Sequence, residues 1–499
     1  MRLLSLLLGL CIAVLLTVNS SAEAACSGSG TTWNCTAGTT ATDVSSTLSS
    51  ASDGATLTFA AGSYSWTSGI NFSMSKGVTL VCASAGGCTV TGSGLIGMNG
   101  SCSGTSTKLY RVSGFVFSGR GTSLWFYGPS ACKLSNVRID HNTFTSPPSG
   151  STLMYFGENS SVDNFIYGVA DHNTVNSSGS INFSQCLNGD NNNPPVGTLG
   201  SDKNFFYEDN TFNISAMTNN GVGLTDTWGG CSQVFRYNKV YNNRIIVHGS
   251  AHAWGPINTE VYKNYVEINN ASDGYVQYGN RLVHHQGSGT YMIFDNAFRA
   301  TAGQTGGPVV VQHSGSQYSR GNDTICNGTA SIDGNRSPSN IYYGYPCYRG
   351  PGRDMDRTLS PMYAWQNRWN NTGGIVTLDC QNYASFTCTA HVVENRDYYN
   401  AVSASAQTSP ASPFNGTIGV GFGTLANRPA TCTTGSETGG GVGYFATDQG
   451  ARGTLYRCSA ANTWVTHYTP YTYPHPLVAG GTGGGAISPP PAPANLTVQ

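Results

Sequence analysis

Charge is scarce in this chain. Of its 499 residues only 10% are Asp, Glu, Lys or Arg, and the formal net charge is −1. An average domain carries about 25% charged residues. Phosphate binding requires clustered Lys and Arg, so we expect no nucleic-acid partner. The shortage of Lys and Glu, which are good helix formers, also argues against a helical protein.

Long apolar segments are absent beyond the N-terminus. There, Arg2 precedes an apolar run over residues 3–18, and Ala22-Glu23-Ala24 follows as a small-x-small site. This order is typical of a cleaved export signal. The run is shorter than the about 20 residues that a spanning helix needs. The sequence therefore predicts a signal peptide over 1–25, no membrane span, and a secreted or cell-surface protein.

Closely spaced cysteine pairs of the Cys-x-x-Cys type are also missing, which argues against a cysteine-ligated metal. Fifteen cysteines are present, and Cys11 lies within the predicted signal. The other fourteen fall into sequence neighbours, and export favours disulfides between them. The expected pairs are Cys26/Cys35, Cys82/Cys88, Cys102/Cys132, Cys186/Cys231, Cys326/Cys347, Cys380/Cys388 and Cys432/Cys458.

What the chain does contain is a repeat of short alternating segments that end in asparagine. Glycine is abundant, with 64 residues, and Asn, Thr and aromatic residues suit short strands and tight turns. Strong copies end at Asn142, Asn173, Asn210, Asn238, Asn264 and Asn296, which are 31, 37, 28, 26 and 32 residues apart. Weaker copies end at Asn322, Asn367 and Asn395.

A repeat of this length predicts a solenoid. One coil cannot bury its inner face, but stacked coils pair their strands in parallel at about 4.8 Å and enclose a continuous core. Asn tolerates a left-handed bend, and stacked Asn side chains can hydrogen-bond along the column. We expect an all-β, right-handed parallel β-helix over 26–400, a small C-terminal β cap over 401–478, and a Gly/Pro-rich tail over 479–499.

One strand carries a family resemblance. The segment 136–142, Asn-Val-Arg-Ile-Asp-His-Asn, resembles the "vWiDH" strand of pectate lyases, and the Asn turns resemble those of the pectin-lyase-like superfamily. The resemblance implies polysaccharide as partner, calcium as cofactor bound by Asp140, and a catalytic Arg in an R-x-P-x-x-R motif. That Arg matches Arg281, with Val283 and Gln286 replacing the Pro and the second Arg.

A different group of residues follows from counting back along the repeat. Asp226, His252 and His284 each lie 12 residues before a repeat asparagine, so they are expected to stack on three consecutive coils. Arg281 and His285 lie close by in sequence. Histidine can act as general acid or base near neutral pH. Asp226, His252 and His284 could alternatively hold a metal, or stack for packing alone.

These patterns leave three functions open. The first is a secreted polysaccharide lyase that cleaves a uronate-containing polymer by β-elimination, with Arg281, His284 and His285 as the chemical groups and His252 and Asp226 in support. The second is a non-catalytic extracellular carbohydrate-binding or adhesin-like solenoid. The third is a glycoside hydrolase, which needs paired carboxylates. A monomer is expected in each case.

Overall fold

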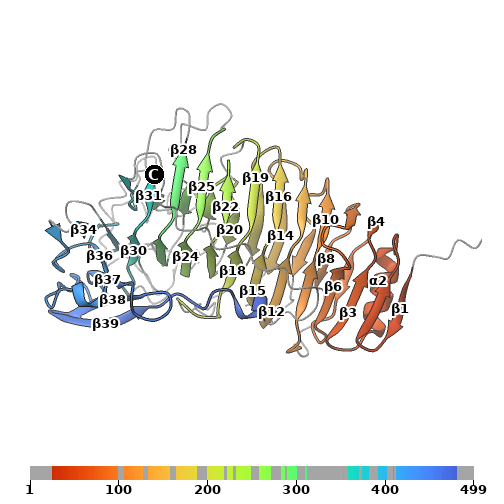
Figure 1. The fold of residues 1–499 in the computed structure, drawn as a ribbon, viewed down its shortest axis with the longest axis horizontal. Coiled ribbons are helices and arrows are strands. Elements are labelled where there is room, and N and C mark those ends of the chain that lie inside the picture. Colours follow the sequence, from red (N-terminus) through yellow and green to blue (C-terminus); the bar gives the residue numbers. More distant parts are fainter. Residues whose placement is uncertain are drawn as a thin grey trace, which may run out of the picture.

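The predicted all-β solenoid is confirmed. In the computed structural model, three long sheets run side by side along one axis, and each coil adds a strand to each sheet (Figure 1). The described residues are 25–98, 106–126, 133–157, 165–187, 199–218, 222–228, 232–248, 258–270, 282–286, 289–300, 309–311, 352, 358–369, 374–380, 392–401, 408–409 and 412–479.

The first sheet has thirteen strands, and only its terminal β1–β2 pair is antiparallel. In sheet order the strands are β1 (Cys26–Ser29), β2 (Thr32–Cys35), β3 (Ala55–Phe59), β6 (Val78–Cys82), β9 (Tyr110–Ser113), β12 (Lys133–Asp140), β15 (Phe165–Asp171), β18 (Phe205–Glu208), β21 (Gln233–Arg236), β24 (Asn258–Tyr262), β27 (Thr290–Phe294), β30 (Met362–Trp365) and β33 (Tyr398–Asn400).

The second sheet follows the first along each coil and has eleven strands. They are β4 (Gly62–Ser65), β7 (Cys88–Thr91), β10 (Phe115–Ser118), β13 (Thr143–Thr145), β16 (Thr174–Ser177), β19 (Thr211–Ile214), β22 (Lys239–Tyr241), β25 (Tyr265–Ile268), β28 (Ala297–Ala300), β31 (Arg368–Trp369) and β32 (Gly374–Ile375).

The third sheet is built in two consecutive pieces. Six strands come first: β5 (Ile70–Phe72), β8 (Ile96–Met98), β11 (Leu124–Phe126), β14 (Thr152–Gly157), β17 (Asn182–Leu187) and β20 (Thr225–Trp228). Three more follow: β23 (Ile245–His248), β26 (Val283–Gln286) and β29 (Val309–Val311). The backbone N–H of Leu224 donates to the carbonyl of Arg244, which joins the two pieces.

From β12 to β30, asparagine closes each tight turn from the first sheet to the second. The side chain of each ladder asparagine is buried. The Oδ1 of Asn142 accepts the N–H of Phe115, and in each later member Oδ1 accepts both the backbone N–H and the Nδ2 of the asparagine one coil before, as Asn238 does for Asn210 at 2.9 and 3.0 Å. The ladder runs through Asn142, Asn173, Asn210, Asn238, Asn264, Asn296 and Asn367. The predicted hydrogen-bonded column is confirmed.

Two details of the predicted ladder differ. The left-handed backbone falls on the residue before each asparagine, for example His141 (φ 54°) and Asp209 (φ 57°), and not on the asparagine itself. Asn395 lies in the turn before β33, where its Oδ1 accepts the N–H of Gly419. Asn322 lies outside the described residues.

The core fills the inside of the coils. Alternate residues of each strand point inward, so one inner row of the first sheet contains Leu80, Val112, Ile139, Ala170 and Tyr207 on successive coils, all at most 1% exposed. Full burial of a large apolar side chain contributes about 1.5–3 kcal/mol. The interior therefore stabilises the solenoid without any ligand.

A helix covers the first coil. Helix α2 (Ala41–Ser50) begins at a capping box in which Thr40 and Asp43 satisfy each other's backbone N–H groups. Its buried residues include Val44 and Leu48, and it packs against β5 and β1. The open end of the apolar core is thereby shielded from water.

The C-terminal region forms a small β unit, as predicted, but it lies along the side of the solenoid. Its elements are β34 (Thr408–Ser409), β35 (Ser412–Pro413), β36 (Val420–Gly423), the 3-10 helix η4 (Leu425–Asn427), β37 (Gly443–Ala446), β38 (Thr454–Ala460), β39 (Thr463–Tyr468) and helix α3 (Pro476–Ala479). An apolar cluster joins it to the outer face of the first sheet. Residues 469–479, here called the strap, run back along that sheet to β15 (Figure 1).

Disulfides connect the cysteines that the structure describes. The predicted pairs Cys26–Cys35, Cys82–Cys88 and Cys432–Cys458 are confirmed. Two further cysteines, Cys186 and Cys380, are also disulfide-bonded. The remaining predicted partners, Cys102, Cys132, Cys231, Cys326, Cys347 and Cys388, lie outside the described residues. Among the helices in the described ranges, none is long and apolar enough to cross a membrane.

Candidate functional site

A row of aromatic and polar side chains lies on the third sheet. Trp125, Tyr155, Gln185 and Asp226 occupy the same register position on four consecutive coils. Their strand neighbours Leu124 and Met154 are fully buried, whereas Trp125, Tyr155 and Gln185 are half-buried, so the row faces outward. These four residues are here called the third-sheet row.

Contacts within the row align its side chains along the solenoid axis. The rings of Trp125 and Tyr155 lie 5.4 Å apart at an interplanar angle of 39°. One coil further on, Gln185 Nε2 donates to Asp226 Oδ2 at 3.2 Å. Asp226 itself is 8% exposed. The row thus offers two ring faces followed by an amide and a carboxylate.

The predicted stack of Asp226, His252 and His284 is not the register found. On β23 and β26, Ile246 pairs with His284 and Val247 pairs with His285. The backbone N–H of Leu224 donates to the carbonyl of Arg244, which places Leu224 in register with Ile245. Two residues further along, Asp226 is therefore in register with Val247, and Val247 pairs with His285. His284 is one residue out of the row. His252 and Arg281 lie outside the described residues.

Connection lengths explain this difference. Counting back from a ladder asparagine crosses the link from the third sheet to the first, and this link has four residues between β20 and β21 but three between β26 and β27, from the strand limits 228–233 and 286–290. Counting back from the ladder therefore cannot hold a constant offset. Links from the third sheet to the first vary even more, from three residues after β26 to fifty after β29, from limits 286–290 and 311–362. Such variable loops commonly build binding sites.

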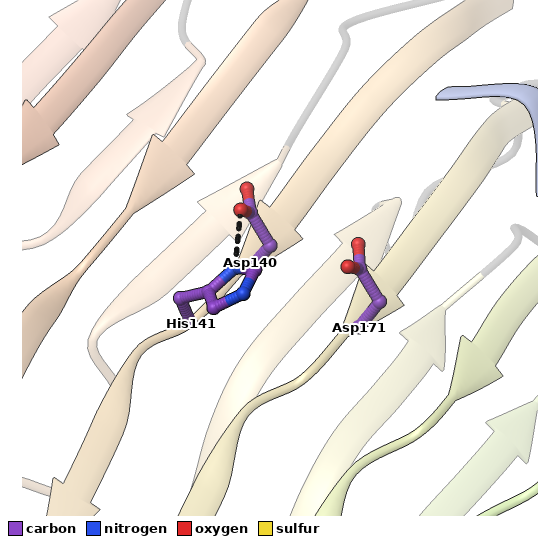
Figure 2. A group of neighbouring side chains, drawn as sticks. All are labelled: Asp140, His141 and Asp171. Carbon is purple, nitrogen blue, oxygen red and sulfur yellow. Dashed lines mark hydrogen bonds and ion pairs between the residues drawn. The ribbon is translucent and has the colours of Figure 1, made fainter. Parts of the chain in front are cut away.

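A second cluster lies where β12 and β15 end. Asp140 and Asp171 are register neighbours, both fully buried, and His141 follows Asp140 at the corner (Figure 2). His141 Nδ1 lies 2.8 Å from Asp140 Oδ2, and His172 Nδ1 lies 2.9 Å from Asp171 Oδ2. The two imidazole rings stack at 5.0 Å with an interplanar angle of 4°.

Metal binding is one reading of this cluster, since ligand atoms of Asp140, His141 and Asp171 all lie within 4.8 Å of one another. Arginines already engage both carboxylates, however. Asp140 accepts from Arg111 Nε and Nη2, both at 2.6 Å, and Asp171 accepts from Arg138 Nε and Nη2, both at 2.9 Å. This charge compensation favours an ion-pair ladder over a calcium site at Asp140.

Electrostatics agree with the ion-pair reading. Burial alone would raise the pKa of Asp140, but hydrogen bonds from Arg111 and His141 and the charge of Arg138 hold that pKa well below its usual range. Asp140 is therefore kept ionised by its neighbours. For His172, burial lowers the pKa, but the hydrogen bond and the negative charge of Asp171 more than offset this effect. The pKa of His172 is therefore raised.

The ladder continues beneath the strap. Glu208 and Arg236 are fully buried, and Arg236 Nη2 lies 2.5 Å from Glu208 Oε2. Arg236 also donates to the carbonyls of Tyr471 and Thr472 in the strap, at 2.9 and 2.8 Å. The backbone N–H of His475 donates to Glu208. These contacts attach the strap to the first sheet and occupy that sheet's outer face.

Asp226 was named as a candidate from the sequence, but Trp125, Tyr155 and Gln185 of the third-sheet row were missed because the members recur at irregular spacings. A usable signal was present in Leu124-Trp125-Phe126 and Met154-Tyr155-Phe156, where an amphipathic ring sits between two apolar residues of a strand. Comparison with known proteins adds no assignment: no family model, no curated protein and no solved structure matches this chain.

Proposed function

We propose that this protein is exported and binds a uronate-containing polysaccharide along the third-sheet row, where it cleaves the polymer as a lyase. The observation that carries the proposal is the single row of Trp125, Tyr155, Gln185 and Asp226, leading on to the coil of His285. Membership of the pectin-lyase-like superfamily is part of the same proposal and rests on the solenoid fold and the segment 136–142.

Binding follows from the chemistry of the row. Amphipathic rings such as Trp and Tyr pack against the C–H faces of sugars, and their polar tips reach hydroxyl groups. The half-buried amide of Gln185 can hydrogen-bond a sugar hydroxyl on the next coil, and the buried carboxylate of Asp226 orients that amide by accepting from its Nε2. The coils advance by about 4.8 Å, so a chain that lies along the axis meets one side chain of the row per coil.

Cleavage would take place beyond Asp226. His285 lies in the register of the row, and His284 and Arg281 are its sequence neighbours. In the proposed β-elimination, Arg281 pairs with the uronate carboxylate and a histidine removes the adjacent C–H proton. The electron pair forms the new C=C bond, the glycosidic C–O bond breaks, and a proton passes to the leaving oxygen. His252 and Asp226 would orient these groups.

Non-catalytic carbohydrate binding is the second candidate. It is favoured because the described histidine–carboxylate pairs, His141 with Asp140 and His172 with Asp171, belong to the ion-pair ladder and lie on a different sheet from the row. A glycoside hydrolase needs two carboxylates, and among the described residues of the row only Asp226 is acidic.

The test uses the mature chain with soluble polygalacturonate and alginate, with and without calcium, and follows ultraviolet absorbance of unsaturated ends. We expect one polymer to give new unsaturated ends and Arg281→Ala to abolish them. The double variant Trp125→Ala/Tyr155→Ala should raise KM. The double variant Trp125→Phe/Tyr155→Phe, which keeps an aromatic ring at both positions, should leave KM close to the wild-type value.

If no uronate polymer gives unsaturated ends, the proposed lyase activity is refuted. Retardation of the same chain on polymer-containing gels, lost in the double alanine variant, would then support the binding function alone. Unchanged KM and unchanged retardation in that variant would contradict the third-sheet row as the binding site.

A further inference from the structure

The outer face of the second sheet carries two regular rows of polar side chains. Thr143, Thr174 and Thr211 are register neighbours on three consecutive coils. Beside them, two residues along each strand, lie Thr145, Asn176 and Asn213. All six are half-buried or exposed, and the intervening residues point into the core. These six residues are here called the second-sheet face.

Most side-chain hydrogen-bonding groups of these six residues have no partner among the residues that the structure describes. Among the described residues, the only side-chain hydrogen bond of the six is from Asn213 Nδ2 to Asn176 Oδ1, at 3.0 Å and exposed. The hydroxyls of Thr143, Thr174 and Thr211 therefore remain available in that part of the chain. By contrast, the side chains of the buried asparagine ladder one turn away bond one another from coil to coil.

Aromatic rings continue the same rows on the next two coils. Tyr241 follows Asn213 in register, and Tyr265 follows Lys239. Both rings are half-buried and lie 5.9 Å apart. Across β13, β16 and β19 the face has no charged residue, and the strap lies on the first sheet, away from it (Figure 1).

We propose that the second-sheet face, with Tyr241 and Tyr265, binds a neutral polysaccharide in an extended, β-1,4-linked conformation that lies along the solenoid axis. Hydroxyls and amides at about 4.8 Å steps match a chain whose sugars advance by a comparable distance, so each coil can bond one sugar. Ring faces suit the flat sides of equatorially linked sugars. The six residues of the second-sheet face give a polyuronate no cation to pair with. The nearest cation in register is Lys239, which lies between Thr211 and Tyr265, and the acid Glu267 follows Tyr241 in the adjoining row.

This site is separate from the proposed cleavage track. The second-sheet face belongs to a different sheet from Trp125 and Tyr155, and its ligand is neutral rather than acidic. Its role would be to anchor the protein on an insoluble matrix. The inference does not require that the chain cleaves anything, because adsorption can be measured without turnover.

The experiment is co-sedimentation of the mature chain with microcrystalline cellulose, in the presence and absence of soluble polygalacturonate. The variant Thr143→Val/Thr174→Val/Thr211→Val removes three hydroxyls but keeps β-branched side chains. Its matched control is Thr56→Val/Thr58→Val/Thr79→Val, which makes the same change on half-buried threonines of the first sheet. Tyr241→Ala is a second, chemically independent variant.

We expect the wild type and the control to sediment alike, and both face variants to bind roughly tenfold or more weakly, from about three net hydrogen bonds or one ring contact. Polygalacturonate should not compete. Absence of sedimentation, equal sedimentation of all variants, or displacement by polygalacturonate would each overturn the inference. If the protein adsorbs through this face but forms no unsaturated ends on any polymer, the proposed lyase activity is contradicted and the binding site on the second sheet is not.

Discussion

Replacement of Asn238 by alanine should destabilise the middle coils of the solenoid. Asn238 Oδ1 accepts the backbone N–H and the Nδ2 of Asn210, at 2.9 and 3.0 Å. Its own Nδ2 lies within hydrogen-bond distance of the carbonyls of Tyr207 and Arg236 and of Asn264 Oδ1. The side chain is 1% exposed, so water cannot replace these partners.

The magnitude follows from the bonds that alanine removes. A buried N–H left without an acceptor, here that of Asn210, costs about 1–3 kcal/mol, and each further hydrogen bond lost costs about 1 kcal/mol. We expect a loss of about 4 kcal/mol around β18 and β21. In a solenoid each coil contacts only its neighbours, so the effect should be local rather than spread over all coils.

Hydrogen exchange of peptides that contain β18 and β19 measures this local opening. About 4 kcal/mol corresponds to exchange roughly a thousandfold faster at the Asn210 amide. The matched control is Asn213→Ala, which removes one exposed hydrogen bond in the same coil and should change stability by under about 0.5 kcal/mol. Equal protection of Asn210 in wild type and Asn238→Ala would refute the reasoning.

Two further predictions concern the first sheet. Arg236→Met leaves the buried Glu208 without its cation, so we expect the free energy of unfolding to fall by about 3–5 kcal/mol and the strap to be cleaved faster by protease. The double variant Arg236→Met/Glu208→Gln should recover most of that stability, and no recovery would argue against the ion pair. The pKa of His172 is raised in the fold, so its stabilising effect is present below the unfolded pKa of about 6.5 and is lost as pH rises through the folded value. Chemical denaturation of His172→Gln and wild type should therefore differ most near pH 6, and a difference independent of pH would contradict the role of Asp171.

The asparagine ladder could be predicted because its geometry is local. From β12 to β30, each link from the first sheet to the second contains two residues, as 141–142 lie between β12 and β13, and the second is the buried asparagine. The conformation of the turn was predicted incorrectly. The asparagine side chain must point into the coil, so the left-handed φ passes to the preceding residue, which points outward and can be His141, Asp209 or Lys263.

The third sheet could not be predicted to the same accuracy. Its strands are followed by links of variable length, so a constant offset from the ladder placed His284 one residue from the register of Asp226, in line with Ile246. A shift of one residue exchanges the two faces of a strand. The contacts of the C-terminal region with the first sheet were equally inaccessible, because Tyr468 bonds Glu260 across 208 residues and no periodic pattern marks that pair.

An outward aromatic residue has two possible meanings in this fold, and the strap separates them. On the first sheet Phe206, Phe294 and Trp365 point away from the interior, yet they are buried by Tyr471, Tyr468 and Phe445 of the C-terminal region. Burial by the chain itself accounts for those rings without a ligand. Trp125 with Tyr155, and Tyr241 with Tyr265, are half-buried on sheets that the strap does not reach. Ligand binding by this solenoid is therefore expected on its second and third sheets, and the first sheet serves to hold the C-terminal region.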